Sequence, residues 1–156
     1  MIYYFSGTGN SYKVAAQLAQ STSTKLVDMS SVAVDVPVCD DAVVGFVLPV
    51  YAWGLPVFVE QFIKSLPRGV RHKYVYAVLT CGDDMGYADA LLRKALKRVG
   101  WQLDAVYVCQ GLMWTVLTCC NVKIAPSASA WHMWRRVWPA GHRLTSVKCY
   151  VEHGPG

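Results

Sequence analysis

The stretch Phe5-Ser6-Gly7-Thr8-Gly9-Asn10-Ser11 decides the fold of this chain of 156 residues. It overlaps the end of the apolar run Met1–Phe5, which is typical of a short β-strand. Apolar residues then recur at helical spacing, at Val14, Ala15, Leu18 and Ala19. A strand, a small polar loop and a helix in this order bind phosphate, because backbone N–H groups at the helix start face the anion along the helix dipole. The stretch therefore predicts a phosphate-binding loop.

The residue types of this loop narrow the class of phosphate. The loop contains no Lys or Arg and no G-x-G-x-x-G pattern, so it lacks the signatures of nucleoside-triphosphatases and of dinucleotide folds. Gly7 and Gly9 let the backbone approach an anion closely. The side chains that can donate hydrogen bonds are Ser6, Thr8, Asn10 and Ser11. This neutral cradle suits a terminal monophosphate, as in FMN; the alternative is a polar loop that only caps a helix.

Composition and charge limit the classes of protein to which this chain can belong. At 54% apolar and 16% charged residues, the chain is expected to fold as a single domain over residues 1–156. No apolar stretch reaches the roughly 20 residues that span a bilayer, and no signal peptide is evident, so we expect a cytoplasmic protein. Residues 1–109 carry ten Lys or Arg and nine Asp or Glu, whereas residues 110–156 carry five and one. The net charge of +5 therefore belongs mainly to the C-terminal region.

The cysteines do not follow a metal-binding pattern. They are Cys39, Cys81, Cys109, Cys119, Cys120 and Cys149. None forms a C-x-x-C pair, so the spacing encodes neither a zinc nor an iron–sulfur site. We expect no metal, and free buried thiols in a reducing compartment.

Apolar runs alternate with helical patterns along residues 1–109, which predicts βαβ units and a parallel sheet. The expected strands are Ile2–Phe5, Leu26–Met29, Ala42–Leu48, Tyr74–Leu79 and Ala105–Cys109. The expected helices are Ser11–Gln20, Pro56–Leu66 and Tyr87–Val99. Four cations of the last helix, Arg93, Lys94, Lys97 and Arg98, are expected to form a solvated face rather than a nucleic-acid patch. The alternation stops after Val108, so residues 110–156 form an atypical region beside a core of residues 1–109.

Loops at the carboxyl ends of parallel strands bind ligands, and two further loops here carry suitable residues. Pro49–Pro56 contains Tyr51 and Trp53, whose rings could stack on a flat ligand, with each ring pair contributing about 1 kcal/mol beyond burial. Alternatively, the two rings could pack the loop against the sheet. Thr80–Tyr87 contains glycines and two carboxylates, Asp83 and Asp84, that could instead cap a helix. Tyr87 could stack on the ligand or lie in the core; stacking is the interpretation that we favour.

The three loops together resemble the flavodoxin family. Ser6–Ser11 is similar to its Ser/Thr-x-Thr-Gly-x-Ser/Thr phosphate signature, and Gly82–Asp89 is similar to its Gly-Asp-x-x-Gly-Tyr-Ala-Asp loop. The resemblance implies an α/β three-layer sandwich with a five-stranded parallel sheet in the order 2-1-3-4-5, and noncovalent FMN. It implies these cofactor-binding residues: Ser6, Gly7, Thr8, Gly9, Asn10, Ser11, Pro49, Val50, Tyr51, Ala52, Trp53, Gly54, Thr80, Cys81, Gly82, Asp83 and Tyr87.

Phe5–Ser11 with Pro49–Pro56 resembles one branch more closely, in which a flavodoxin domain precedes a ferredoxin domain with two four-iron clusters. The likeness covers residues 1–109. Two departures are evident: there is no C-x-x-C-x-x-C run for the ferredoxin half, and residues 110–156 do not resemble the family's closing helix. A truncated or frameshifted reading frame would explain both.

The function that the resemblance implies is electron transfer, of one or two electrons, between a reductase and an acceptor. Redox proteins would be the partners: a reductase, an iron–sulfur protein or an acceptor enzyme, with no nucleic acid and no membrane. No catalytic residue is expected, because the cofactor carries the chemistry. The alternatives are an NAD(P)H-dependent FMN or quinone reductase, and a non-redox binding module that uses the cationic, Trp-rich tail.

Overall fold

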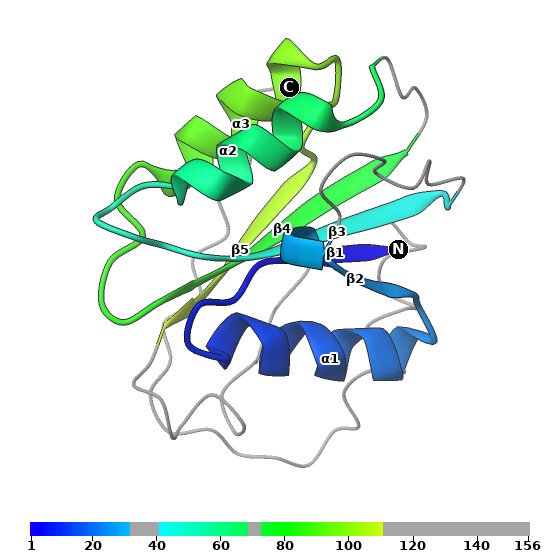
Figure 1. Ribbon diagram of the computed structural model, residues 1–156, viewed down its shortest axis with the longest axis horizontal. Helices are drawn as coiled ribbons and strands as arrows, with labels where there is room; N and C mark the ends of the chain where they lie inside the picture. Colours follow the sequence, from blue (N-terminus) through cyan, green and yellow to red (C-terminus); the bar gives the residue numbers. More distant parts are fainter. Residues whose placement is uncertain (32–40, 69–72, 111–156) are drawn as a thin grey trace.

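The computed structural model describes residues 1–31, 41–68 and 73–110 (Figure 1). In chain order the strands are β1 (Ile2–Tyr4), β2 (Leu26–Asp28), β3 (Val43–Pro49), β4 (Tyr74–Cys81) and β5 (Ala105–Gln110). The helices are α1 (Asn10–Thr22), α2 (Val57–Ser65) and α3 (Ala88–Arg98), with a 3₁₀ turn at Met29–Ser31. The eight predicted elements are confirmed, and their ends differ from the prediction by at most two residues.

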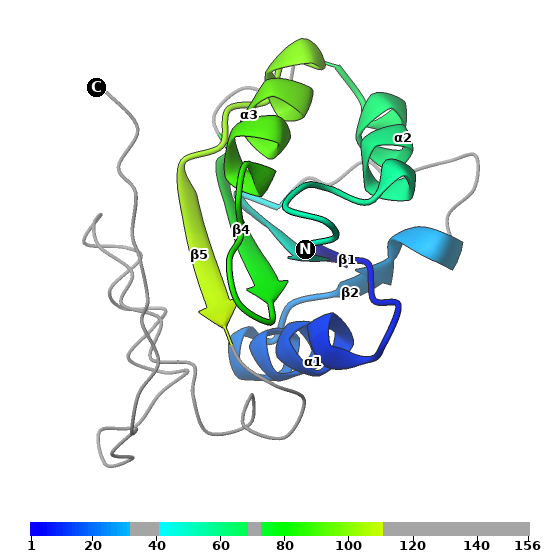
Figure 2. The ribbon, with the colours of Figure 1, turned by 90° about the vertical axis from the view of Figure 1, so that its left-hand side faces the viewer.

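The five strands form one parallel sheet in the order β2-β1-β3-β4-β5, which confirms the predicted fold class. Helices α2 and α3 cover one face of the sheet and α1 covers the other, so the described residues form three layers (Figures 1 and 2). The near-continuous apolar run of β3 follows from this arrangement, because a strand between two helical layers is buried on both faces.

Side chains that alternate along the strands fill two separate cores. Tyr3 and Phe46 stack with ring centroids 5.6 Å apart, on the face that α2 and α3 cover. On the opposite face, Val14 and Leu18 of α1 belong to the same buried cluster as Val47. Burying an aliphatic side chain in this way stabilises the fold by about 1.5–3 kcal/mol. The two cores fix the register, since a slip by one residue would exchange the faces.

Some predictions concern metal sites, cysteines and the C-terminal region. In residues 1–31, 41–68 and 73–110 there is no group of three or more His, Cys, Asp or Glu that could hold a metal ion. Cys81 and Cys109 are buried and form no disulfide. The other four cysteines and the predicted atypical region after residue 110 lie outside the described residues. None of the helices in the described ranges is both long enough and apolar enough to cross a membrane.

Candidate functional site

All strands run in the same direction, so the loops that follow β1, β3 and β4 lie at the same edge of the sheet. We call residues 6–11 the first loop, residues 50–56 the second loop and residues 82–87 the third loop. The first and second loops meet at Gly7, where a methyl group would lie 2.2 Å from the Tyr51 hydroxyl oxygen. Gly7 therefore permits the close approach of Tyr51.

The first loop presents hydrogen-bond donors at the start of α1. Gly9, with φ 89°, is the N-cap residue, and no side chain caps the helix. The Gly9 N–H donates to the Ser6 Oγ atom over 3.0 Å, which leaves the Ser6 hydroxyl proton available. The side chains of Thr8 and Asn10 have no hydrogen-bond partner among the described residues. The positive φ alone explains why position 9 is a glycine, because nothing within 4 Å would meet a methyl group there.

Ser11 has a different environment from the other hydroxyl residues of the first loop. It is buried, and its Oγ atom lies 2.8 Å from the Thr80 Oγ1 atom of β4. Either hydroxyl can donate in this pair, and the Thr80 Oγ1 atom also lies 3.4 Å from the Leu48 carbonyl oxygen. This contact ties the start of α1 to the end of β4. The Ser11 backbone N–H remains at the helix start.

The second loop contains a strained two-residue turn. Tyr51 and Gly54 exchange backbone hydrogen bonds of 3.1 and 2.9 Å. Between them, Ala52 and Trp53 have φ values of 47° and 58°, in the left-handed region that usually takes Gly or Asn. Such strain persists only where surrounding contacts impose it, and it is common at ligand sites. Here it holds the Trp53 side chain outward, 66% exposed.

The third loop is joined to this turn by its backbone. The Tyr87 N–H donates to the Trp53 carbonyl over 2.9 Å. At Gly86, with φ 56°, a methyl group would lie 2.4 Å from the Trp53 Cβ atom. The Asp84 carboxylate accepts from the Gly86 N–H over 2.8 Å and shapes the loop.

Two of the alternatives left by the sequence are excluded by these positions. Neither Asp83 nor Asp84 caps α3, because its N-cap residue, Tyr87, has no side-chain cap hydrogen bond. The Tyr87 side chain is 77% exposed, so it does not lie in the core. Tyr51 is exposed as well, although it covers Gly7. The second and third loops thus present three exposed rings at the sheet edge.

The remaining predicted residues form the floor and rim of this edge. Pro49 is buried at the end of β3, and the Val50 N–H donates to the Thr80 carbonyl over 2.9 Å. Burial, with smaller effects of Cys109, Asp84 and Asp83, raises the pKa of the Cys81 thiol to about 11, so the thiol stays protonated at neutral pH. Nothing within 4 Å would meet a methyl group at Gly82, which faces open space.

Two residues that join the site were not among those predicted. Gly86 is the second glycine of the Gly-Asp-x-x-Gly-Tyr-Ala-Asp motif. Its residue type was the only sequence signal for its positive φ. Leu91 of α3 would lie 3.4 Å from a methyl group at Gly54, so the Leu91 side chain packs against the second loop. No sequence signal distinguished it from the other leucines of α3.

The comparisons with known proteins agree with the fold. The family model described as "Flavodoxin domain" matches residues 1–118. No curated protein matches the chain. Among solved structures, Megasphaera elsdenii flavodoxin in the two-electron reduced state is 19% identical, with 73% of this chain and 88% of that chain covered and a TM-score of 0.56.

Two further solved structures show the same fold. Oxidised Flavodoxin 1 from Bacillus cereus is 13% identical, with 74% of this chain and 87% of that chain covered and a TM-score of 0.57. A flavodiiron core from Synechocystis sp. PCC6803 is 12% identical, with 70% of this chain and 29% of that chain covered and a TM-score of 0.55. On the family match, which spans most of its length, the chain belongs to the flavodoxin domain family, and FMN is the cofactor that this membership implies.

Proposed function

We propose that this chain is an electron carrier that holds FMN in the three loops and passes one or two electrons between a reductase and an acceptor protein. The observation that carries the proposal is the joining of these loops through Gly7–Tyr51 and Trp53–Tyr87. A binding surface that depends on three separate segments needs such contacts to keep its shape.

The first loop fits the phosphate of FMN by the chemistry of its donors. The hydroxyls of Ser6 and Thr8 and the Asn10 amide can donate to a phosphate oxygen. Uncapped N–H groups at the start of α1 add donors and a favourable dipole. Gly7 and Gly9 keep the backbone accessible. Ser11 contributes its backbone N–H, since its buried hydroxyl is paired with the Thr80 hydroxyl.

The second and third loops fit a flat ring. The exposed rings of Tyr51, Trp53 and Tyr87 offer surfaces on which a ring can stack. The backbone at Gly82 faces open space, and Gly54 belongs to the proposed lining through the turn that it closes with Tyr51. The other members of the proposed lining are Pro49, Val50, Ala52, Thr80, Cys81 and Asp83. When bound, FMN supplies the redox chemistry. The chain's residues bind and orient it, and the protonated Cys81 thiol offers no competing nucleophile.

The finer placement within the family is also a proposal. The segments Phe5–Ser11 and Pro49–Pro56 support a place beside the flavodoxin domains of flavodoxin–ferredoxin fusion proteins. An iron–sulfur protein would then be the natural partner. We further propose a single domain over residues 1–156 and a cytoplasmic location, which the absence of a disulfide at the buried Cys81 and Cys109 supports.

The experiment that tests this function is reconstitution of the full chain with FMN and, separately, with riboflavin. We expect stoichiometric FMN with a perturbed visible spectrum, and much weaker binding of riboflavin. Equal affinity for the two would overturn the assignment of the first loop to phosphate. Direct oxidation of NADH or NADPH by the loaded protein, without another enzyme, would favour the reductase over the carrier.

A further inference from the structure

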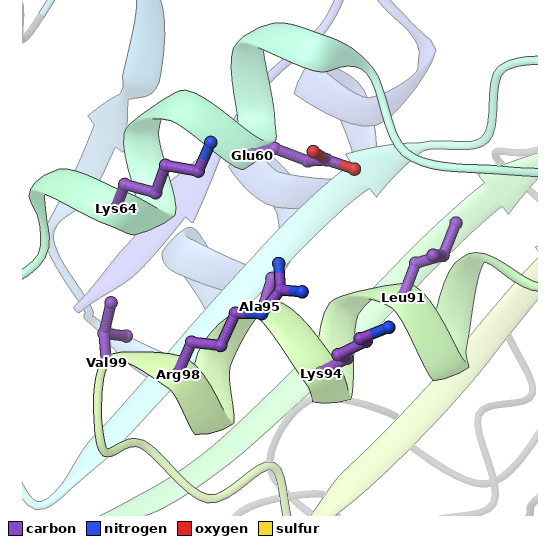
Figure 3. A pocket seen from close by; sticks show the side chains of 7 residues that line it. All are labelled: Glu60, Lys64, Leu91, Lys94, Ala95, Arg98 and Val99. Carbon is purple, nitrogen blue, oxygen red and sulfur yellow. The ribbon is translucent and has the colours of Figure 1, made fainter.

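A hollow lies between α2 and α3, on the outer side of the helical layer (Figure 3). Its volume is about 160 Å³. Leu91 and Ala95 of α3, with Val99 directly after the helix, give it an apolar floor. Leu91 also lies beneath Gly54, so the hollow begins beside the second loop and extends along both helices away from it.

The rim of the hollow is cationic. Lys64 of α2 and Lys94 and Arg98 of α3 line it, opposed by one carboxylate, Glu60. All three cations are exposed, and none lies within ion-pair distance of a carboxylate in the described part of the chain. The last-turn positions of Lys64 and Arg98 suit the helix dipoles, but Lys94 lies earlier in α3. The dipole therefore does not account for the whole cluster.

We propose that this hollow docks the acidic face of a redox partner protein. Carboxylates of the partner contact the three cations, and an aliphatic side chain of the partner packs on the apolar floor. The inference rests on the proposed function and adds the chemistry of the partner. A partner seated there would border the second loop, through Leu91 and Gly54. Opposite charge on partner surfaces speeds encounter and fixes orientation more than it adds affinity.

Two other occupants fit less well. Residues 111–156 carry five Lys or Arg and one acidic residue, so this region of the chain has the same sign of charge as the hollow. No aromatic side chain lines the hollow, so a nucleic acid would find no ring there on which a base could stack. The apolar floor between cations instead matches an acidic, partly aliphatic protein surface.

The test compares two variants that lose the same charge. Lys94→Gln/Arg98→Gln removes two rim cations, whereas Lys13→Gln/Lys25→Gln removes two exposed cations away from the hollow, one of them on α1 across the sheet. The probe is a fluorescent peptide of alternating Glu and Leu, titrated by anisotropy against the full chain with and without FMN. We expect the rim variant to weaken binding roughly three- to thirty-fold, and the control less than about two-fold. Replacing Leu by Asn in the peptide should also weaken binding.

A kinetic measurement links the hollow to electron transfer. The FMN-loaded chain, reduced chemically, is mixed with a strongly acidic [2Fe–2S] ferredoxin or with neutral benzoquinone. We expect the rim variant to slow transfer to the ferredoxin by a similar factor and to leave the reaction with benzoquinone unchanged.

The outcomes separate the two proposals. A chain that takes up FMN but shows equal effects for the rim variant and the control overturns the docking surface alone. Tighter binding of oligothymidylate than of the peptide, lost in the rim variant, also overturns it. A chain that takes up no FMN overturns the proposed function, whatever the peptide does.

Discussion

The backbone N–H of Tyr87 donates a hydrogen bond to the carbonyl oxygen of Trp53 over 2.9 Å. This bond joins the third loop to the second, although the two residues are 34 positions apart in the chain. It also restrains the turn in which Ala52 and Trp53 have positive φ values. Two exposed aromatic side chains are thereby held through their main chain, which leaves their rings available to a ligand.

Gly86→Ala is expected to break this junction. The new methyl group would need a left-handed backbone and would overlap Trp53, which costs about 1–3 kcal/mol of unfolding free energy. Urea unfolding of the apoprotein measures the loss, and FMN titration should show weaker binding. Gly82→Ala is the control for the stability measurement, because open space surrounds position 82. Similar stability of the two variants would contradict the proposed role of the junction.

Thr8→Ala and Ser11→Ala are expected to act differently. Thr8 has a free hydroxyl, so its loss should weaken FMN by about 1.5–3 kcal/mol and leave riboflavin affinity and stability nearly unchanged. Ser11→Ala removes the buried bond to Thr80 and should lower the unfolding free energy of the apoprotein by about 0.5–1.5 kcal/mol. Calorimetric titration and urea unfolding measure the two effects. A Thr8→Ala protein that weakens riboflavin as much as FMN would remove Thr8 from the phosphate site.

Asp83→Asn and Asp84→Asn are each expected to make bound FMN easier to reduce. Reduction places negative charge on the flavin ring, and a nearby carboxylate disfavours that charge. Because solvent and salt screen these exposed carboxylates, the midpoint potential should rise by only roughly tens of millivolts. Asparagine at position 84 retains an oxygen that accepts from Gly86. Asp104→Asn, just before β5 at the opposite edge of the sheet, is the control. Unchanged midpoint potentials in both test variants would mean that these carboxylates only shape the loop.

Stability is expected to fall at alkaline pH. Burial raises the pKa of Tyr76 and of Tyr107 above the ordinary value of 10.0, and that of Cys81 from 9.0 to about 11. Above pH 9 the unfolded chain loses these protons while the folded chain keeps them, so the unfolding free energy decreases as pH rises. Each group contributes up to about 1.4 kcal/mol per pH unit. Urea unfolding from pH 7 to 11 measures the slope, which Tyr76→Phe should flatten; a level profile in the parent would refute the prediction.

Residues after Gln110 are expected not to build the flavin site. The three joined loops all precede Ala88, and they contain all the proposed phosphate donors and stacking rings. Trp114→Ala and Trp131→Ala should therefore leave FMN affinity within about two-fold of the parent, which fluorescence titration measures. Abolition of FMN binding by either substitution, in a protein that remains folded, would show that the C-terminal region contributes directly.

Much of the fold was predictable because the pattern of apolar residues is local. The apolar run of β3 and the helical spacing of apolar residues in α3 each indicate the type of element from a short stretch of sequence. Glycine-rich loops with hydroxyl residues mark the phosphate site for the same reason: their chemistry lies in consecutive positions. The sequence therefore predicted the elements, their order and which loops carry the candidate site.

The contacts between loops were decided only by the tertiary structure. Nothing local in residues 80–87 indicates that Gly86 meets Trp53, or that the Thr80 hydroxyl forms a hydrogen bond with that of Ser11. The same is true of the hollow, since Lys64 and Lys94 come together only when α2 and α3 pack on one face. The sequence by itself determined the elements and the chemistry of each loop. Packing determined which groups are buried, strained or shared, because those properties depend on residues distant in the chain.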